Sequence, residues 1–173
     1  MEDRQMSNEM TTTSSSLENF NPGRASLLEM RADPSRFPRL KSVPREQAVF
    51  EMTKIVNQAF LYRGQAADPT NIQFISSALV QELLDDDKYG AGYLSLAEIQ
   101  VVVKRAVLQD DMYGISVASL YKVIIEYIKG EGHRLQQEVS ERKRKSEQEQ
   151  IKNSVIAPML QAYAGELLNH SKL

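Results

Sequence analysis

The chain has 173 residues, of which 42% are hydrophobic and 25% are charged, and 21 Lys and Arg against 23 Asp and Glu give a formal net charge of −2. This composition is typical of a soluble globular protein with one domain and appendages, and the lack of a long apolar run excludes a membrane-spanning helix. The sequence contains no Cys and only two His, His133 and His170, which excludes disulfides, thiolate catalysis and Cys-based metal sites.

The first 23 residues form an acidic, low-complexity segment. They carry four acids and one base, and Thr11 to Ser16 read TTTSSS. Such a segment cannot bury enough apolar surface to offset the entropy of ordering, so we predict a disordered tail over residues 1–23. It also lacks the basic start and apolar stretch of a secretory signal.

Residues 24–45 are basic, with six bases and two acids, and three prolines prevent a long helix there. Apolar side chains alternate with arginines in this segment. We predict a docking arm that becomes ordered on a partner, and the alternative is a strap that lies along its own domain. The residues expected to bind the partner are Arg31, Arg36, Phe37, Arg39, Leu40 and Lys41.

From Pro44 onward, apolar residues recur at the three- and four-residue steps that are typical of α-helices. The spacing predicts one helix over about residues 45–62 and a second over about 69–84. Two more helices are expected to begin at Ser95 and Ser116, and Gly130 and Gly132 are expected to end the last of them. Residues 46–131 should therefore form a compact all-α bundle of about four helices.

The C-terminal part, residues 132–173, is predicted to contain a long charged helix followed by an amphipathic one. Residues 133–150 are polar nearly all round, which is typical of a helix that projects into solvent or rests on a partner. Pro158 is expected to interrupt the more apolar stretch that follows. The candidate nucleic-acid-binding residues are Arg142, Lys143, Arg144 and Lys145. The alternative is a solvated helix whose bases are balanced by nearby glutamates.

The segment from Asp87 to Glu98 has the spacing of a calcium-binding EF-hand loop, but its chemistry is wrong for calcium. The third and fifth positions, which must supply oxygen ligands, are Tyr89 and Ala91. A capping box between Ser95 and Glu98 explains the same residues, so we predict a helix start and no metal site. The sequence also lacks a phosphate-binding loop and the common hydrolase motifs.

Residues 93–127, with Ile128 directly after them, contain the strings Leu-Ser-Leu-Ala-Glu-Ile, Lys-Arg-Ala-Val-Leu, Met-Tyr-Gly-Ile-Ser-Val-Ala-Ser-Leu-Tyr and Glu-Tyr-Ile. This stretch, about a fifth of the chain, resembles short helical proteins of phages and mobile elements of Bacteroides-type bacteria. The resemblance implies a bacterial or phage protein that acts in DNA replication as helicase loaders without ATPase activity do. Such loaders act by binding, so the resemblance implies no catalytic residues.

We therefore predict a non-enzymatic protein-interaction module without cofactor or metal. The expected partner is a protein, either a replicative helicase or a phage structural protein. Two alternatives stay open, namely a structural or packaged component of a phage particle and a DNA-binding regulator, and self-association is a further open question. The expected location is the cytoplasm of a bacterial host, or the virion if the protein is a particle component.

Overall fold

The structure is a computed structural model that describes residues 25–109, 112 and 114–170, including their side chains except those of 155 and 157–170. The described chain is helical and has no β-strand, although Arg39 and Ser95 form an isolated antiparallel bridge. It separates into two compact units with the boundary between Lys129 and Gly130. The predicted all-α class is confirmed, whereas the predicted tail over residues 1–23 lies outside the described residues.

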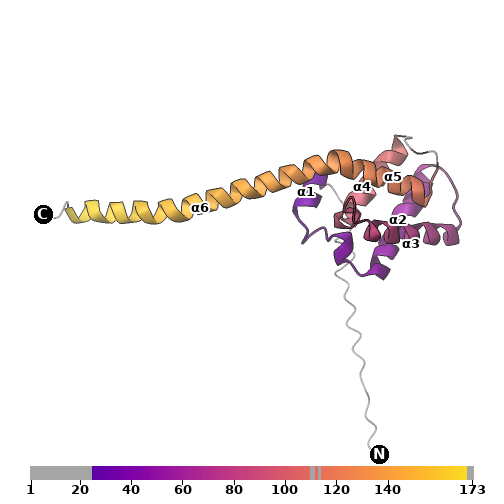
Figure 1. The fold of residues 1–173 in the computed structure, drawn as a ribbon, viewed down its shortest axis with the longest axis horizontal. Helices are drawn as coiled ribbons and strands as arrows, with labels where there is room; N and C mark the ends of the chain where they lie inside the picture. The colour runs from indigo at the N-terminus through magenta and orange to yellow at the C-terminus, as the bar shows by residue number, and fades with distance from the viewer. Residues whose placement is uncertain (1–24, 110–111, 113, 171–173) are drawn as a thin grey trace, which may run out of the picture. The chain divides into compact units, whose positions relative to one another are not determined.

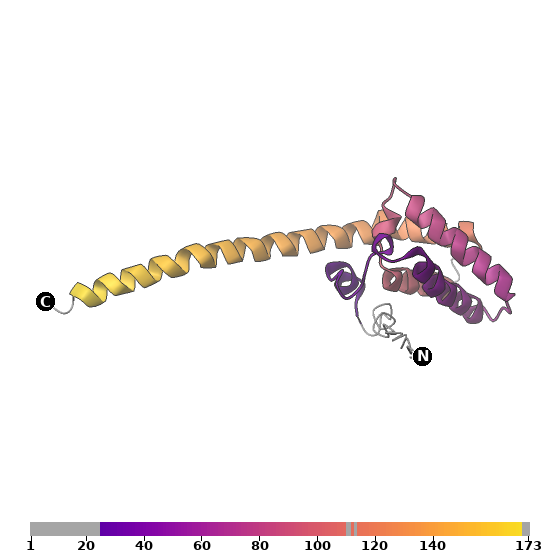
Figure 2. The same cartoon turned by 90° about the horizontal axis from the view of Figure 1, so that it is seen from below.

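Four helices form the body of the first unit: α2 (Arg45–Tyr62), α3 (Pro69–Asp85), α4 (Leu96–Leu108) and α5 (Val117–Tyr127) (Figure 1). Their starts have the expected chemistry, because the side chains of Asp68, Ser95 and Ser116 cap α3, α4 and α5. Helix α2 packs along α3 and α4, and α5 packs against α3 and α4. Figure 2 shows α2 and α3 side by side. The predicted bundle is confirmed.

The core of this unit is made by the apolar face of each helix. Val56 in α2, Leu79 in α3, Ile99 in α4 and Leu120 in α5 are completely buried. Each of these residues belongs to the periodic apolar pattern of its segment. The same period that predicts the helices therefore also predicts which side of each helix faces the core.

Residues 26–43, here called the strap, precede the bundle and contain a short helix that the sequence pattern does not predict. Helix α1 (Leu27–Ala32) begins at Ser26, whose side chain exchanges capping hydrogen bonds with Glu29. The strap then runs in an irregular conformation to a single 3₁₀ turn, Leu40–Ser42. Helix α1 packs against α4.

The second unit is dominated by one helix, and here two sequence predictions are wrong. Gly130 and Gly132 do not end the helical path, because Ile128–Gly132 forms a π-helical turn that is followed directly by α6 (His133–His170). Glycine costs only about 1 kcal/mol in a helix relative to alanine, so two glycines weaken a helix without forcing it to stop. Pro158 does not divide the segment either, and α6 extends over 38 residues.

Candidate interaction surfaces

The strap is held by its own domain, which corrects the prediction of a docking arm. Phe37 and Leu40, the two apolar anchors expected to bind a partner, are 1% and 0% exposed. The amide of Leu40 donates a hydrogen bond of 2.8 Å to the carbonyl of Leu94. Burial of two large apolar side chains contributes several kcal/mol to folding, so the same side chains are not available to a partner in this conformation.

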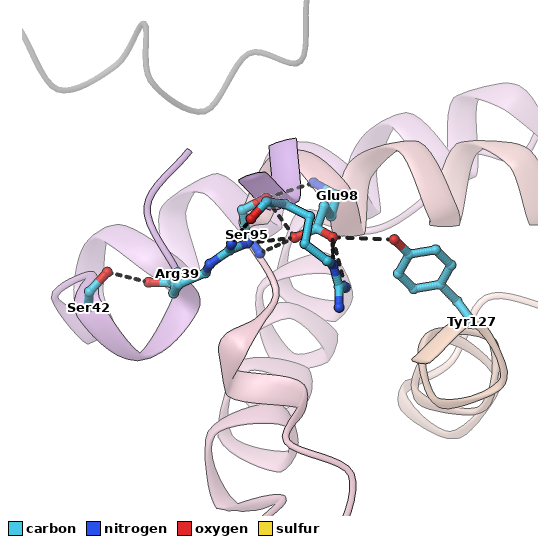
Figure 3. Close-up of polar contacts among 6 residues, drawn as sticks. Arg39, Ser42, Ser95, Glu98 and Tyr127 are labelled. Carbon is cyan, nitrogen blue, oxygen red and sulfur yellow. Dashed lines mark hydrogen bonds and ion pairs between the residues drawn. The ribbon is translucent and has the colours of Figure 1, made fainter. Parts of the chain in front are cut away.

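Glu98, at the start of α4, attaches the strap through a buried cluster of charged and polar groups (Figure 3). Its side chain is fully buried, and its Oε1 accepts a hydrogen bond of 2.8 Å from Nε of Arg31. Arg39 Nη1 lies 3.1 Å from Oε2 and Tyr127 Oη lies 3.3 Å from Oε1. The amide of Ser95 donates to Oε2 at 3.0 Å, so the same carboxylate also completes the cap of α4.

Two arginines against one carboxylate leave this cluster with an excess positive charge. Burial lowers the pKa of Arg39, while the nearby Glu98 raises it and Arg31 lowers it. Arginine stays protonated in proteins, so Arg39 keeps its charge in spite of this burial. Arg39 also donates to the backbone carbonyl of Arg31, which ties the two parts of the strap together. The arrangement is suited to positioning the strap.

The cluster gives Glu98 a different role from the one that the last glutamate of a calcium loop has. In an EF-hand the last glutamate of the loop faces the ion, whereas Glu98 here faces two guanidinium groups. The predicted capping box of Ser95 and Glu98 is confirmed. Among the residues with described side chains, no group of three or more Asp, Glu or His is placed to hold a metal ion.

The sequence pattern offers one clue to the second role of Glu98. Glu98 lies three residues after Ser95 and four before Val102, and all three are buried on the inward side of α4. A carboxylate on the inward face of a helix needs a charged partner. The spacing within α4 does not reveal which arginines supply it, because they lie about sixty residues earlier in the chain.

Two of the six predicted partner-binding residues lie on the surface. Arg36 is exposed and its guanidinium lies 5.1 Å from the centre of the Phe37 ring. Lys41 is exposed, and its Nζ lies 3.8 Å from Asp87 and 4.8 Å from the centre of the Tyr93 ring. The six residues therefore do not form one surface: four hold the strap in place and two remain accessible.

The four basic residues of α6, Arg142 to Lys145, are all exposed. Arg142 forms an ion pair of 2.7 Å with Glu138, and Lys143 lies 3.9 Å from Glu147. Both pairs join residues four apart, where exposed ion pairs stabilise a helix by about 0.3–0.5 kcal/mol each. The predicted basic cluster is therefore a real surface feature, although its charge is partly balanced within the helix.

The same helix exposes apolar side chains beyond the basic cluster. Every residue from Ser140 to Ser154 is exposed, and Ile151 and Ile156 are 63% and 50% exposed. Large aliphatic side chains in water on a helix are typical of a surface that a partner covers. Positive charges and apolar side chains thus follow one another along α6.

A second surface, which the sequence analysis missed, lies on α2 and α4. Along α2 it contains Phe50, Lys54, Gln58 and Tyr62, spaced four residues apart, and along α4 it contains Gln100, Lys104 and Leu108. Gln100 donates to Gln58 at 3.1 Å, and Lys104 Nζ lies 5.7 Å from the centre of the Tyr62 ring. Between the two rows is a shallow groove whose floor includes Ile55, Ala59 and Val103. We call this the α2–α4 surface.

The feature of the sequence that could have indicated this surface is the excess of large apolar residues in α2. Phe50 and Tyr62 lie off the inward face and are 56% and 43% exposed, and Leu108 is 60% exposed. A single exposed apolar residue needs no explanation, but several in two adjacent rows suggest a binding surface. Only the packing of α2 on α4 shows that the rows are adjacent.

Comparison with protein-family models, with curated proteins and with solved structures gives no match to this chain. None of the helices in the described part of the chain combines the length and the apolar character that crossing a membrane requires. The function is therefore argued from the surfaces themselves.

Proposed function

We propose that this protein is a non-enzymatic interaction module and that α6 is its partner-binding element. The observation that carries the proposal is the run of exposed side chains from Ser140 to Ser154, which includes four consecutive bases and continues to two exposed isoleucines. The strap was the element predicted for this role from the sequence. Its apolar anchors, however, are buried in the first unit itself.

The physical argument concerns how a long polar helix is stabilised. At 1.5 Å per residue, the 38 residues of α6 span about 57 Å. Helices in water gain most of their stability from packing of an apolar face. Weak ion pairs between residues four apart supply only part of the stability that such packing would give. A partner that covers Ile151 and Ile156 while it places acidic or phosphate groups near Arg142–Lys145 would supply the rest.

The side-chain inventory supports a role in binding rather than catalysis. The chain has no Cys and two His, and it carries no phosphate-binding loop. Its fully buried carboxylate, Glu98, is bound to Arg31 and Arg39 and is closed to a substrate. Binding is therefore the activity that these residues support best.

The narrower form of the proposal is an accessory to phage or mobile-element DNA replication that engages a replicative helicase. It rests on the resemblance of residues 93–127 to such proteins. The residues that carry the resemblance at the start of α4, from Leu94 to Ile99, are buried. They would therefore preserve the fold in related proteins, and the partner would be recognised elsewhere on the chain.

Capture of partners from the native host tests the proposal. Tagged full-length protein is compared with two variants of α6, one in which Arg142, Lys143, Arg144 and Lys145 become Glu and one with Ile151→Ser and Ile156→Ser. The matched control is Lys122→Glu with Glu126→Lys, which reverses an exposed ion pair on α5 without changing the net charge. We expect mass spectrometry to find proteins bound to the wild type and the control but lost from both α6 variants. An unchanged set of proteins on the α6 variants would refute the assignment.

Binding to DNA distinguishes the regulator alternative. Fluorescence anisotropy of labelled duplex and single-stranded DNA is measured over a range of salt concentrations for the wild type and the fourfold Glu variant. An affinity that falls steeply with salt and disappears in the variant would favour a DNA-binding regulator, because phosphate contacts release counterions. A captured capsid or portal protein would favour the particle component, and a captured helicase the replication accessory.

A further inference from the structure

The α2–α4 surface exposes positive charge on the acidic body of the protein. Its two exposed charged residues are Lys54 and Lys104. The carboxylate of Glu51 pairs with Lys54 at 2.7 Å, the exposed Glu46 lies one step before Phe50 in the same row of α2, and the carboxylate of α4 is the buried Glu98. Residues 46–131 as a whole carry seven bases and twelve acids. Lys104, against which the described part of the chain places no carboxylate, therefore gives this part of a mostly acidic body a local positive charge, and Lys54 lies in the neighbouring row.

The apolar side chains of this surface indicate what kind of ligand it fits. Tyr62 lines a shallow groove with an apolar floor, and Phe50 and Leu108 are exposed farther along α2 and α4. A ligand that fits this surface would place acidic residues near the lysines and large, adaptable apolar residues against the aromatic rings and the aliphatic side chain. A purely acidic ligand would leave these side chains uncovered.

The N-terminal segment of the same chain has this composition. Residues 1–23 contain four acids, Glu2, Asp3, Glu9 and Glu18, against the single base Arg4, and their large apolar residues are Met1, Met6, Met10, Leu17 and Phe20. We propose that residues 1–23 bind the α2–α4 surface of their own chain. The inference is independent of the proposed function, because α6 belongs to the other unit.

The connection of the segment to the domain makes this contact feasible. The segment joins the domain at the strap, and α1 in the strap packs against α4, which forms half of the surface. A chain of 23 residues can reach up to about 75 Å when extended, which is more than enough to reach either helix. Tethering also raises the local concentration of the segment to the order of millimolar, so weak contacts are enough.

Spin labelling of the full-length chain tests the proposal directly, and the absence of Cys makes labelling at one site straightforward. A spin label on Ser14→Cys broadens the amide signals of nearby residues in the spectrum of the isotope-labelled protein. At low salt we expect loss of the signals of Gln58, Tyr62 and Lys104. The signals should return in Lys54→Glu/Lys104→Glu and at high salt, because screening weakens exposed charge pairs.

Three further samples make the result decisive. The control variant Lys122→Glu, at an exposed position of α5, should leave the broadening unchanged. Adding Glu9→Lys/Glu18→Lys to the Lys54→Glu/Lys104→Glu variant should restore the broadening. In a mixture of spin-labelled chains with separate isotope-labelled chains, no broadening is expected. Broadening in that mixture would show that the segment binds a second copy and would overturn the proposal. Broadening spread evenly over the domain, or unaffected by charge reversal, would overturn it as well.

Discussion

The two oxygens of the Glu98 carboxylate serve different neighbours. Oε1 accepts hydrogen bonds from Arg31 and Tyr127, whereas Oε2 accepts from Arg39 and from the amide of Ser95. A buried ion pair gains little net stability over a well-packed apolar group, but removing one partner leaves the other charged and buried. Here removal of one carboxylate would leave two guanidinium groups without their counter-charge.

We therefore expect Glu98→Gln, which keeps the size of the side chain, to lower the free energy of unfolding by about 3 kcal/mol or more. Urea denaturation followed by circular dichroism measures the change. The matched control is Glu126→Gln, which removes the charge from an exposed ion pair with Lys122 and should cost no more than about 1 kcal/mol. Equal stabilities of the two variants would show that the cluster does not hold the strap.

Asp33, next to helix α1, gives a prediction on pH. The hydroxyl of Ser35 and the amide of Arg36 donate to its carboxylate, and these hydrogen bonds hold the pKa of Asp33 below its ordinary value of 3.8. A lowered pKa in the folded state means that the charged form stabilises the fold above the unfolded pKa. That stabilisation is lost as the pH falls through the folded pKa.

Asp33→Asn should therefore have a lower Tm than the wild type at neutral pH. The difference between the two proteins should shrink as the pH falls below about 4. Differential scanning calorimetry at a series of pH values measures it, and Asp87→Asn, at a fully accessible surface position, serves as a control. A difference in Tm that stays constant down to acidic pH would contradict the assigned role of the Asp33 charge.

At the scale of the elements, local sequence patterns predict well where helices form, but they predict poorly which elements pack against one another. The apolar period and the caps Asp68, Ser95 and Ser116 predict the starts of three helices, because these signals lie within a few residues of the helix that they specify. In the strap the pattern identifies Phe37 and Leu40 as anchors. It does not say where they are buried, because that depends on helices formed by distant residues.

The path of α6 through Pro158 leads to a prediction for this element. Proline lacks an N–H group and its ring crowds the preceding turn, so it costs about 3 kcal/mol in a helix interior. We expect Pro158→Ala to stabilise this part of α6 by up to about 3 kcal/mol. Hydrogen exchange of the backbone amides of residues 151–157 measures the effect, which should be slower exchange.

The control for this variant is Pro44→Ala, at the start of α2, which should leave exchange in α6 unchanged. Unchanged exchange in Pro158→Ala would contradict the prediction, since it would mean that the proline does not lower the stability of the helix.

At the scale of the whole molecule, the sequence predicts the all-α class, the four-helix body and the exposed basic cluster from Arg142 to Lys145. It does not predict the Glu98 cluster or the α2–α4 surface. Both are made by residues about forty to sixty-seven positions apart, which only tertiary packing brings together. The four-helix body follows from a local sequence pattern that recurs in each helix. Each of these sites, in contrast, is formed by contacts between distant segments.

The contact between Arg31 and Glu98 also bears on the order in which the domain folds, because it spans 67 residues. Closing so long a loop costs entropy that must be spent before the ion pair forms, so local helices form sooner. During synthesis the strap leaves the ribosome well before α4 does, and it cannot form its native contacts until α4 has been made. The part of the domain that is made first is therefore among the last to reach its native position.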